Sequence, residues 1–432
     1  MDSIKISEDF IQFVWKFGLF KKDELLLGDG QKIQIVHVGK QNQDGGPDFF
    51  DAKIYFNDIL WIGNVEIHHN WKQWYQHKHQ LDANYNTVIL HVCYYGEQKS
   101  VKLQNGRDLP CLVIGDLIFK QTLQSYNTLQ NTKAVFIPCQ ALLGPRQLER
   151  MDLYMESWII ERLLRKASDI EKELDYLHGD LEMLFITLLF QYFGAPKNKD
   201  NFTLLVRSIN LRLLHHQACS LRQLESFLFG MADLLEAKDT YSKRLEQEFS
   251  FVKVKYDLKP LCKRQHWNFT GMRPPSFPSI RLAQLAALLF KNLHLFSSIL
   301  EVEHLKDLHH LFKIEVSAYW QKHYFFAQEA SWCTKNISYP FINSLVINVV
   351  VPFLFFYAKY LDEEKYFLRA LDLLREIKSE ENSVIRGFRK LNFTVENALQ
   401  SQALLQLKRA YCEKKNCLNC RIAFSMLSGD IT

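Results

Sequence analysis

The sequence predicts an α+β protein in which a small N-terminal α/β core (helix, three strands, helix, strand) is followed by a large all-α region. Before residue 115, short alternating or β-branched runs are separated by Gly, Asn and Asp turns. After Pro138, long Leu-rich segments repeat with a period near 3.6 residues, which is typical of helices. The length of 432 residues also favours several domains. We expect an α/β domain at 1–137, a helical domain at 138–400 and a basic, cysteine-containing segment at 401–432.

The first elements follow from capping and turn residues. Ser7 precedes an amphipathic stretch and suits a helix N-cap. Asn57-Asp58 separates two β-rich runs and predicts a tight turn between antiparallel strands. In order, we expect a helix at 8–20, strands at 32–38, 48–56 and 59–68, a helix at 70–79, a strand at 87–94, and a hairpin at 100–114 that turns at Asn105-Gly106.

The helical region is predicted to follow a long linking segment at 116–133. Its proline-rich stretch at 271–278 excludes a helix and predicts an ordered loop. The most apolar stretch, 345–357, is interrupted by Asn348 and Pro352 and predicts a buried, kinked helix, so no membrane partner is expected. Helices are expected near 146–172, 179–193, 201–214, 221–236, 240–256, 279–297, 301–325, 342–360, 364–376 and 394–412.

The composition constrains location and partners. The start of the chain has neither a basic nor an apolar signal region, so we expect a cytoplasmic protein with reduced thiols. A net charge of +5 is mild for this length, and it permits a nucleic-acid partner without requiring one.

Two acidic residues form the main candidate site. Side chains alternate along a strand, so Glu66 and His68 share one face. The turn at Asn57-Asp58 brings Asp48 close to the end of the strand that carries Glu66. Two carboxylates and the carbonyl of Ile67 would give an oxygen-rich site for a hard divalent cation. Such an ion can orient a water nucleophile and neutralise charge on a phosphodiester.

Histidines are concentrated beside this pair. Five of the chain's fifteen histidines fall between residues 68 and 91. We rank His68 first, as the residue that activates or positions water, and His91 and His79 next, as metal ligands. His69 ranks below them, and each single histidine also fits a surface or core role.

Residues 7–94 resemble the PD-(D/E)xK restriction-endonuclease-like superfamily in element order, in the Pro-Asp dipeptide and in a Glu-x-His where that family has an acidic residue, x and Lys. The resemblance implies that Asp48 and Glu66 bind magnesium or manganese and that His68 stands in the lysine position. It also implies that Glu8 is an extra acidic ligand. Because neutral histidine is not a permanent cation, two alternatives remain: an active variant that uses manganese or zinc as readily as magnesium, and a relic that only binds.

The whole chain also resembles a bacterial family of uncharacterised proteins, which implies an architecture but no function. The matching stretches are Gly-Pro-Asp-Phe, Gly-Asn-Val-Glu-Ile-His, Val-Ile-Leu-His-Val, Arg-Pro-Pro-Ser-Phe-Pro-Ser-Ile-Arg and the terminal cysteines.

Two further groups are candidates for binding. Cys412, Cys417 and Cys420 have the spacing of a zinc knuckle and of part of a plant-type iron–sulfur motif. A fourth ligand would come from Cys262, Cys333 or a histidine, and three reduced thiols without metal are an equal alternative. Arg273 and Arg281, which bracket the proline-rich loop, are candidate phosphate contacts.

The sequence therefore favours a divalent-metal-dependent nuclease, or a nuclease-derived protein that binds DNA or RNA. Two alternatives stay open. One is a non-catalytic helical interaction scaffold with an inactive nuclease-like domain, and the other is a histidine-rich zinc hydrolase.

Overall fold

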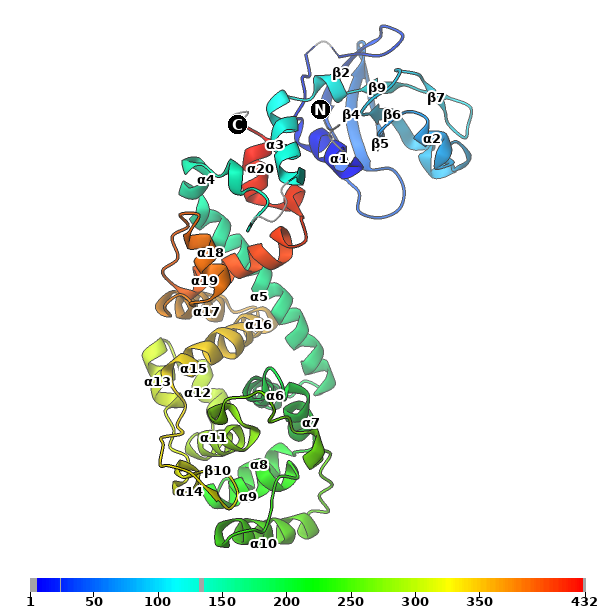
Figure 1. Cartoon of the computed structure of the whole chain (residues 1–432). Helices are drawn as coiled ribbons and strands as arrows, with labels where there is room; N and C mark the ends of the chain where they lie inside the picture. Colours follow the sequence, from blue (N-terminus) through cyan, green and yellow to red (C-terminus); the bar gives the residue numbers. More distant parts are fainter. Residues whose placement is uncertain (1–5, 24, 132–135, 430–432) are drawn as a thin grey trace. The chain divides into compact units, whose positions relative to one another are not determined.

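The computed structural model of the protein describes residues 6–23, 25–131 and 136–429 (Figure 1). The chain divides into two compact units. The first unit combines the chain up to Tyr154 with segments 387–393 and 405–432, and the second unit contains 155–386 and 394–404. Most of the C-terminal segment expected as a separate part thus belongs to the first unit. The predicted α+β class is confirmed, because a mixed sheet precedes a large helical region.

The first unit is built on a seven-stranded mixed sheet with the order β1-β2-β4-β5-β6-β9, to which β3 adds beside β4. β1, β2, β4 and β5 pair antiparallel, whereas β5, β6 and β9 are parallel. The strands are β1 (Leu25–Leu26), β2 (Lys32–His37), β3 (Lys40–Gln41), β4 (Phe49–Phe56), β5 (Ile59–His68), β6 (Val88–Cys93) and β9 (Cys111–Val113).

The helix α1 (Glu8–Phe17) begins as its sequence predicts. The Ser7 hydroxyl accepts a hydrogen bond from the Phe10 amide, and Gly18 ends the helix in the left-handed conformation. The buried face includes Phe10, Val14 and Trp15, and the helix contacts β5. This packing places α1 beside the strand that carries Glu66.

Three expectations for the first unit are wrong. The helix expected at 70–79 is only one turn, α2 (Gln73–Gln76), because Lys78 adopts φ 64° and the chain continues as 3₁₀ turns η1 (His79–Leu81) and η2 (Ala83–Thr87). The hairpin at 100–114 contains only β7 (Val101–Lys102) and β8 (Asp108–Leu109), since β9 leaves to pair with β6. The expected link at 116–133 contains the helix α3 (Lys120–Asn131). Residues 132 and 133 of this link lie outside the described ranges.

The later part of the chain is helical as predicted, but several expected helices are divided. For example, Asn210 caps a new helix by accepting a hydrogen bond from the Leu213 amide, which splits the segment expected at 201–214. The segment expected at 301–325 ends in a small hairpin of β10 (His323–Phe325) and β11 (Gln328–Glu329). The helices are α4 (Pro145–Glu149), α5 (Met151–Tyr176), α6 (Leu181–Gly194), α7 (Lys199–Arg207), α8 (Leu211–Gln217), α9 (Leu221–Met231), α10 (Thr240–Lys255), α11 (Pro278–Lys291), α12 (Leu295–Glu301), α13 (Leu305–Phe312), α14 (Ala318–Gln321), α15 (Tyr339–Leu345), α16 (Val351–Leu361), α17 (Glu364–Glu376), α18 (Ser383–Arg389), α19 (Ala398–Gln406) and α20 (Arg421–Leu427).

α15 and α16 form one continuous helix through the π-helical turn η7 (Val346–Val350). The π turn directly precedes Pro352, whose ring nitrogen cannot donate a backbone hydrogen bond. This 23-residue helix is long and apolar enough to cross a membrane, and 72% of its apolar window is buried within the protein. α11 and α12, bent by 73°, pass the same test as a pair. The absence of a membrane partner stays a prediction.

Gly63 lets β5 and β6 approach each other beside the candidate site. A Cβ at this position would contact the Ile89 side chain and lie 2.7 Å from the Thr87 carbonyl oxygen. We expect Gly63→Ala to lower the free energy of unfolding by about 1–3 kcal/mol, as is usual for overpacking. Thermal denaturation of the two variants checks this, with Gly45→Ala as the matched control because nothing lies within 4 Å of its Cβ position. Equal midpoints for both variants would contradict the packing argument.

Candidate functional site

The β4–β5 hairpin places Asp48 and Glu66 side by side. The Asp48 amide donates a hydrogen bond of 3.2 Å to Glu66 Oε2, and Asp48 Oδ2 accepts one of 2.9 Å from the Ile67 amide. Asp48 Oδ1 accepts a third hydrogen bond, of 2.8 Å, from Gln12 on α1. The strand pairing shifts between Phe49 and Ala52, where Asp51 has φ 57°, so Phe49 pairs with Val65. The two carboxyl groups meet at the expected end of the sheet.

Two histidines approach the other carboxylate oxygen of Glu66, and a third lies beside them. Glu66 Oε1 lies 3.6 Å from His68 Nε2 and 3.4 Å from His79 Nε2. His68 Nε2 in turn lies 3.0 Å from His77 Nδ1. One nitrogen of each of the three histidines lies within 4.8 Å of the other two. Imidazole nitrogens with one carboxylate oxygen are a donor set that suits zinc and other borderline metals.

His77 was not among the residues selected from the sequence, and the local backbone explains its place. Lys78 between the two histidines is left-handed, so the helix stops; His79 then faces Glu66, and His77 lies beside His68. The His79 ring lies against Tyr85, with centroids 3.9 Å apart, and against buried Trp74, with centroids 5.3 Å apart. His79 Nε2 is buried without a hydrogen-bond partner, although it faces Glu66. An unpartnered nitrogen of this kind fits a ligand position.

His91 lies behind His68. It pairs with Glu66 across the parallel strands β5 and β6, and its Nε2 lies 2.8 Å from His68 Nδ1. A partner on the second nitrogen fixes the orientation of a metal-binding imidazole. His91 instead groups with Cys93 and Cys111, whose ligand atoms lie within 4.8 Å of its own. The structure therefore places His91 in a supporting position rather than in the group around Glu66.

Burial sets the charge of the site. It raises the pKa of Asp48 to about 7 and that of Glu66 to about 9, and the neighbouring Asp48 raises the pKa of Glu66 further. Burial and neighbouring histidines lower the pKa of His68 to about 2 and that of His79 to about 4. His68 and His79 are thus neutral imidazoles that can bind a metal at neutral pH. A bound cation would stabilise the charged forms of the two buried carboxyl groups.

Without metal, the two carboxyl groups should make stability fall as pH rises. Their pKa values in the folded protein exceed those of the unfolded chain, so the stabilising contribution of their protonated forms is lost as pH passes about 7 for Asp48 and about 9 for Glu66. We expect the thermal midpoint of chelator-treated protein to fall between pH 6.5 and pH 9, and Glu66→Gln to flatten this dependence. His68 and His79 change the pH dependence of stability only below pH 6.5, where they take up protons in the unfolded chain but stay neutral in the folded protein. A midpoint that rises towards pH 9 would contradict the burial of the pair.

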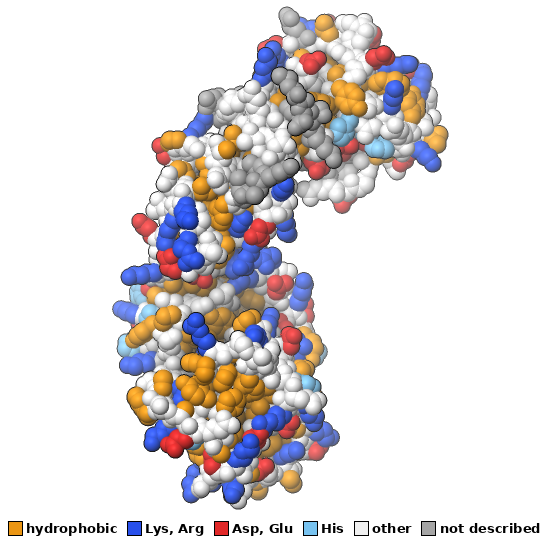
Figure 2. All heavy atoms as spheres, in the orientation of Figure 1, with side chains coloured by type: hydrophobic (Ala, Val, Ile, Leu, Met, Phe, Trp, Pro, Cys, Tyr) orange, Lys and Arg blue, Asp and Glu red, His pale blue; other side chains and the backbone are white. Residues whose placement is uncertain are grey.

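The site is closed on the sheet side and open at His77. Glu66 is 5% exposed and His68 is fully buried, whereas His77 is exposed. Histidine side chains are visible at the surface of the first unit in Figure 2. Glu8, the predicted extra acidic ligand, is half-buried, and its carboxylate lies 3.8 Å from His69 Nδ1. A substrate would therefore reach the carboxylates past His77.

The two arginines of the proline-rich loop differ. Arg273 is exposed before the 3₁₀ turn η6 (Pro274–Ser276). Arg281 lies within α11, where its guanidinium stacks on Phe341 at 4.0 Å and donates a 2.8 Å hydrogen bond to Gln284. Burial lowers the pKa of Arg281 to about 10. Arg281 is thus engaged in packing, and phosphate contact by the two arginines stays a prediction.

A family model described as "Protein of unknown function (DUF2851)" matches residues 8–383. The chain belongs to the DUF2851 family. The match includes the whole sheet and every residue of the site around Glu66, but it ends before Cys412. No curated protein and no solved structure matches the chain. The comparisons lend no support to the restriction-endonuclease-like resemblance, and DUF2851 membership assigns no activity.

Proposed function

We propose that the chain is a divalent-metal-dependent hydrolase of phosphodiester bonds, that is, a nuclease. The observation that carries this proposal is the position of Glu66. One of its oxygens faces His68 and His79, and the other accepts the Asp48 amide. Glu66, His68, His77 and His79 are the proposed ligands, and Asp48 lies beside them.

The donor set determines which ion fits. Magnesium prefers oxygen ligands, whereas three imidazole nitrogens with one carboxylate favour zinc, and manganese accepts such a set more readily than magnesium does. Such an ion would activate water and neutralise charge on a phosphate. The Asp48 carboxylate, with a pKa raised to about 7 by burial, is suited to accept the proton of that water near neutral pH. His91 holds the ring of His68 in place.

The choice of a phosphodiester rests on the sequence resemblance. The sequence features behind that resemblance are the Pro-Asp dipeptide and the Glu-x-His, and α1 contacts the strand that carries Glu66. His68 replaces the lysine of that family, and it is neutral because burial lowers its pKa to about 2. A metal held by histidines would supply the positive charge that lysine contributes there.

A second candidate is a zinc hydrolase that acts on a small substrate. The burial of Glu66 and His68 favours it, because a polynucleotide must reach an ion whose central ligands are buried.

One assay separates these functions. The purified full-length protein would be incubated with magnesium, manganese or zinc and with single- and double-stranded DNA, RNA and a small chromogenic phosphodiester. We expect a polynucleotide to be cut with manganese or zinc and not with chelator. Cleavage of the small ester alone would favour the second candidate. Neither metal binding nor cleavage of any substrate would overturn the proposal.

A further inference from the structure

Four cysteines of the first unit come together, although one lies more than 270 residues from the others. Cys139 directly precedes the 3₁₀ turn η4 (Gln140–Leu142) and is 6% exposed. Cys412 ends the π turn η8 (Leu407–Cys412), and Cys417 begins the 3₁₀ turn η9 (Cys417–Asn419). Cys420 caps α20, and both Cys412 and Cys420 are buried. None of the chain's nine cysteines, which all lie in described ranges, forms a disulfide.

The four thiols also act on one another electrostatically. After burial, the Cys420 and Cys417 sulfurs are the main causes that raise the pKa of Cys139, which reaches about 12. Cys412 also has a raised pKa because of burial and then of Cys420, Cys139 and Cys417. Each of the four thiols is therefore within electrostatic range of the other three.

Two contacts of the chain that precedes Cys139 join it to the C-terminal segment. The Lys408 ammonium donates a 2.7 Å hydrogen bond to the Phe136 carbonyl and lies 4.9 Å from the Phe136 ring. On α3, the Thr122 hydroxyl donates a 2.8 Å hydrogen bond to the Leu427 carbonyl. The convergence of the cysteines is thus built into the packing of the unit.

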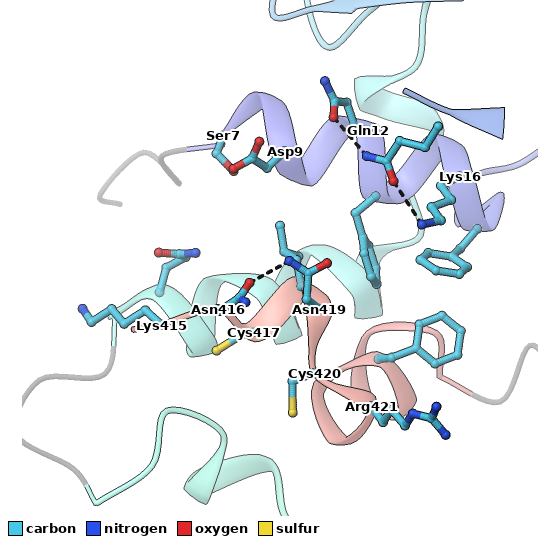
Figure 3. A pocket seen from close by; sticks show the side chains of 16 residues that line it. Ser7, Asp9, Gln12, Lys16, Lys415, Asn416, Cys417, Asn419, Cys420 and Arg421 are labelled. Carbon is cyan, nitrogen blue, oxygen red and sulfur yellow. Dashed lines mark hydrogen bonds between the residues drawn. The ribbon is translucent and has the colours of Figure 1, made fainter. Parts of the chain in front are cut away.

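The C-terminal segment also packs on α1, and its sulfurs point the other way. The rings of Phe17 and Phe424 have centroids 4.6 Å apart. Figure 3 shows the pocket on this side, with Cys417 and Cys420 directing both sulfurs away from α1 and from Gln12 and Lys16. The two sulfurs therefore lie on the side of the segment that faces away from α1.

We propose that Cys139, Cys412, Cys417 and Cys420 bind a metal centre through four thiolates. This corrects the expected source of the fourth ligand. Cys262 and Cys333 both lie in the second unit, where their thiols donate to the carbonyls of Asn201 and Thr334.

An iron–sulfur cluster fits this quartet better than a single zinc ion. Four thiolates around one zinc ion at about 2.3 Å would place the sulfurs about 3.8 Å apart. Among the described residues, the groups with three ligand atoms within 4.8 Å of one another are the two that contain histidine, and the cysteine quartet is wider. A cluster occupies the centre of its ligands and separates the sulfurs further. The spacing Cys-x4-Cys-x2-Cys also matches a plant-type cluster motif.

Metal analysis of the full-length protein, purified without oxygen, tests the proposal. We expect iron and inorganic sulfide in fixed ratio to protein, with a broad visible absorbance that dithionite bleaches. Colourless protein with one tightly bound zinc would assign the same thiolates to zinc. Cys139→Ser should lose as much metal as Cys420→Ser, and Cys219→Ser should lose none, because Cys219 is an exposed thiol of the second unit.

X-ray absorption of the bound metal separates a lost ligand from a misfolded protein. In Cys139→Ser, residual metal should have fewer sulfur neighbours while the circular dichroism spectrum stays unchanged. Absence of iron and zinc from the wild-type protein would overturn the proposal. So would full metal content and an unchanged sulfur shell in Cys139→Ser.

Discussion

Replacing Glu66 by Gln is expected to abolish divalent-metal binding at the site around Glu66 and, with it, any metal-dependent hydrolysis. The substitution keeps the shape of the side chain but removes the charge that faces His68 and His79. Loss of a residue that only supports a ligand costs about 10–100-fold in metal affinity, so loss of the central carboxylate should cost at least about 100-fold. Isothermal titration with zinc and manganese measures the affinity.

The matched control is Glu97→Gln, which removes an exposed carboxylate from the same unit. It should bind metal as the wild type does. Glu66→Gln should also fold at least as stably as chelator-treated wild type at pH 8, because the amide is neutral without taking up the proton that the buried Glu66 carboxyl must gain on folding. Unchanged zinc and manganese affinity in Glu66→Gln would refute the site.

Replacing His77 by Ala is expected to change which metal the protein prefers. His77 is exposed, so its loss should disturb the fold little, but it removes a nitrogen 3.0 Å from His68 Nε2. We expect zinc affinity to fall by about 10–100-fold or more, whereas magnesium affinity, which depends on oxygen ligands, should change little. Parallel titrations with both ions measure this selectivity.

His37→Ala is the matched control, since His37 is an exposed histidine at the end of β2 and lies outside the group around Glu66. It should leave both affinities unchanged. An equal loss of zinc and magnesium affinity in His77→Ala would show that His77 acts on the structure and not as a selective ligand.

Local sequence patterns were sufficient to bring Asp48 and Glu66 together. The turn at Asn57-Asp58 fixes which residues of β4 and β5 pair, and β5 begins and ends at the expected residues. Near Asp48 the observed register of β4 and β5 differs by one position from the register that the turn predicts. The cause is the left-handed backbone of Asp51, which a hydrophobic pattern does not reveal.

The histidine ligands depend on contacts that the sequence does not show. His77 and His79 lie within a segment expected to be helical, and the left-handed Lys78 ends the helix between them, which leaves His79 facing Glu66 and His77 beside His68. His91 is behind His68 because β5 and β6 run parallel in a particular register. The burial that makes these groups neutral comes from Trp74 and Tyr85, which are brought there by tertiary packing.

The division of the first unit into distant segments has a consequence for biosynthesis. Roughly 250 residues separate Tyr154 from Leu405, and a ribosome that adds about 5–20 residues per second needs roughly 13–50 seconds to make them. During that time the face of α1 that Phe424 covers remains exposed to solvent, and the three cysteines that join Cys139 have not yet been synthesised. The unit that starts to form first is therefore completed last, when nearly the whole chain has left the ribosome.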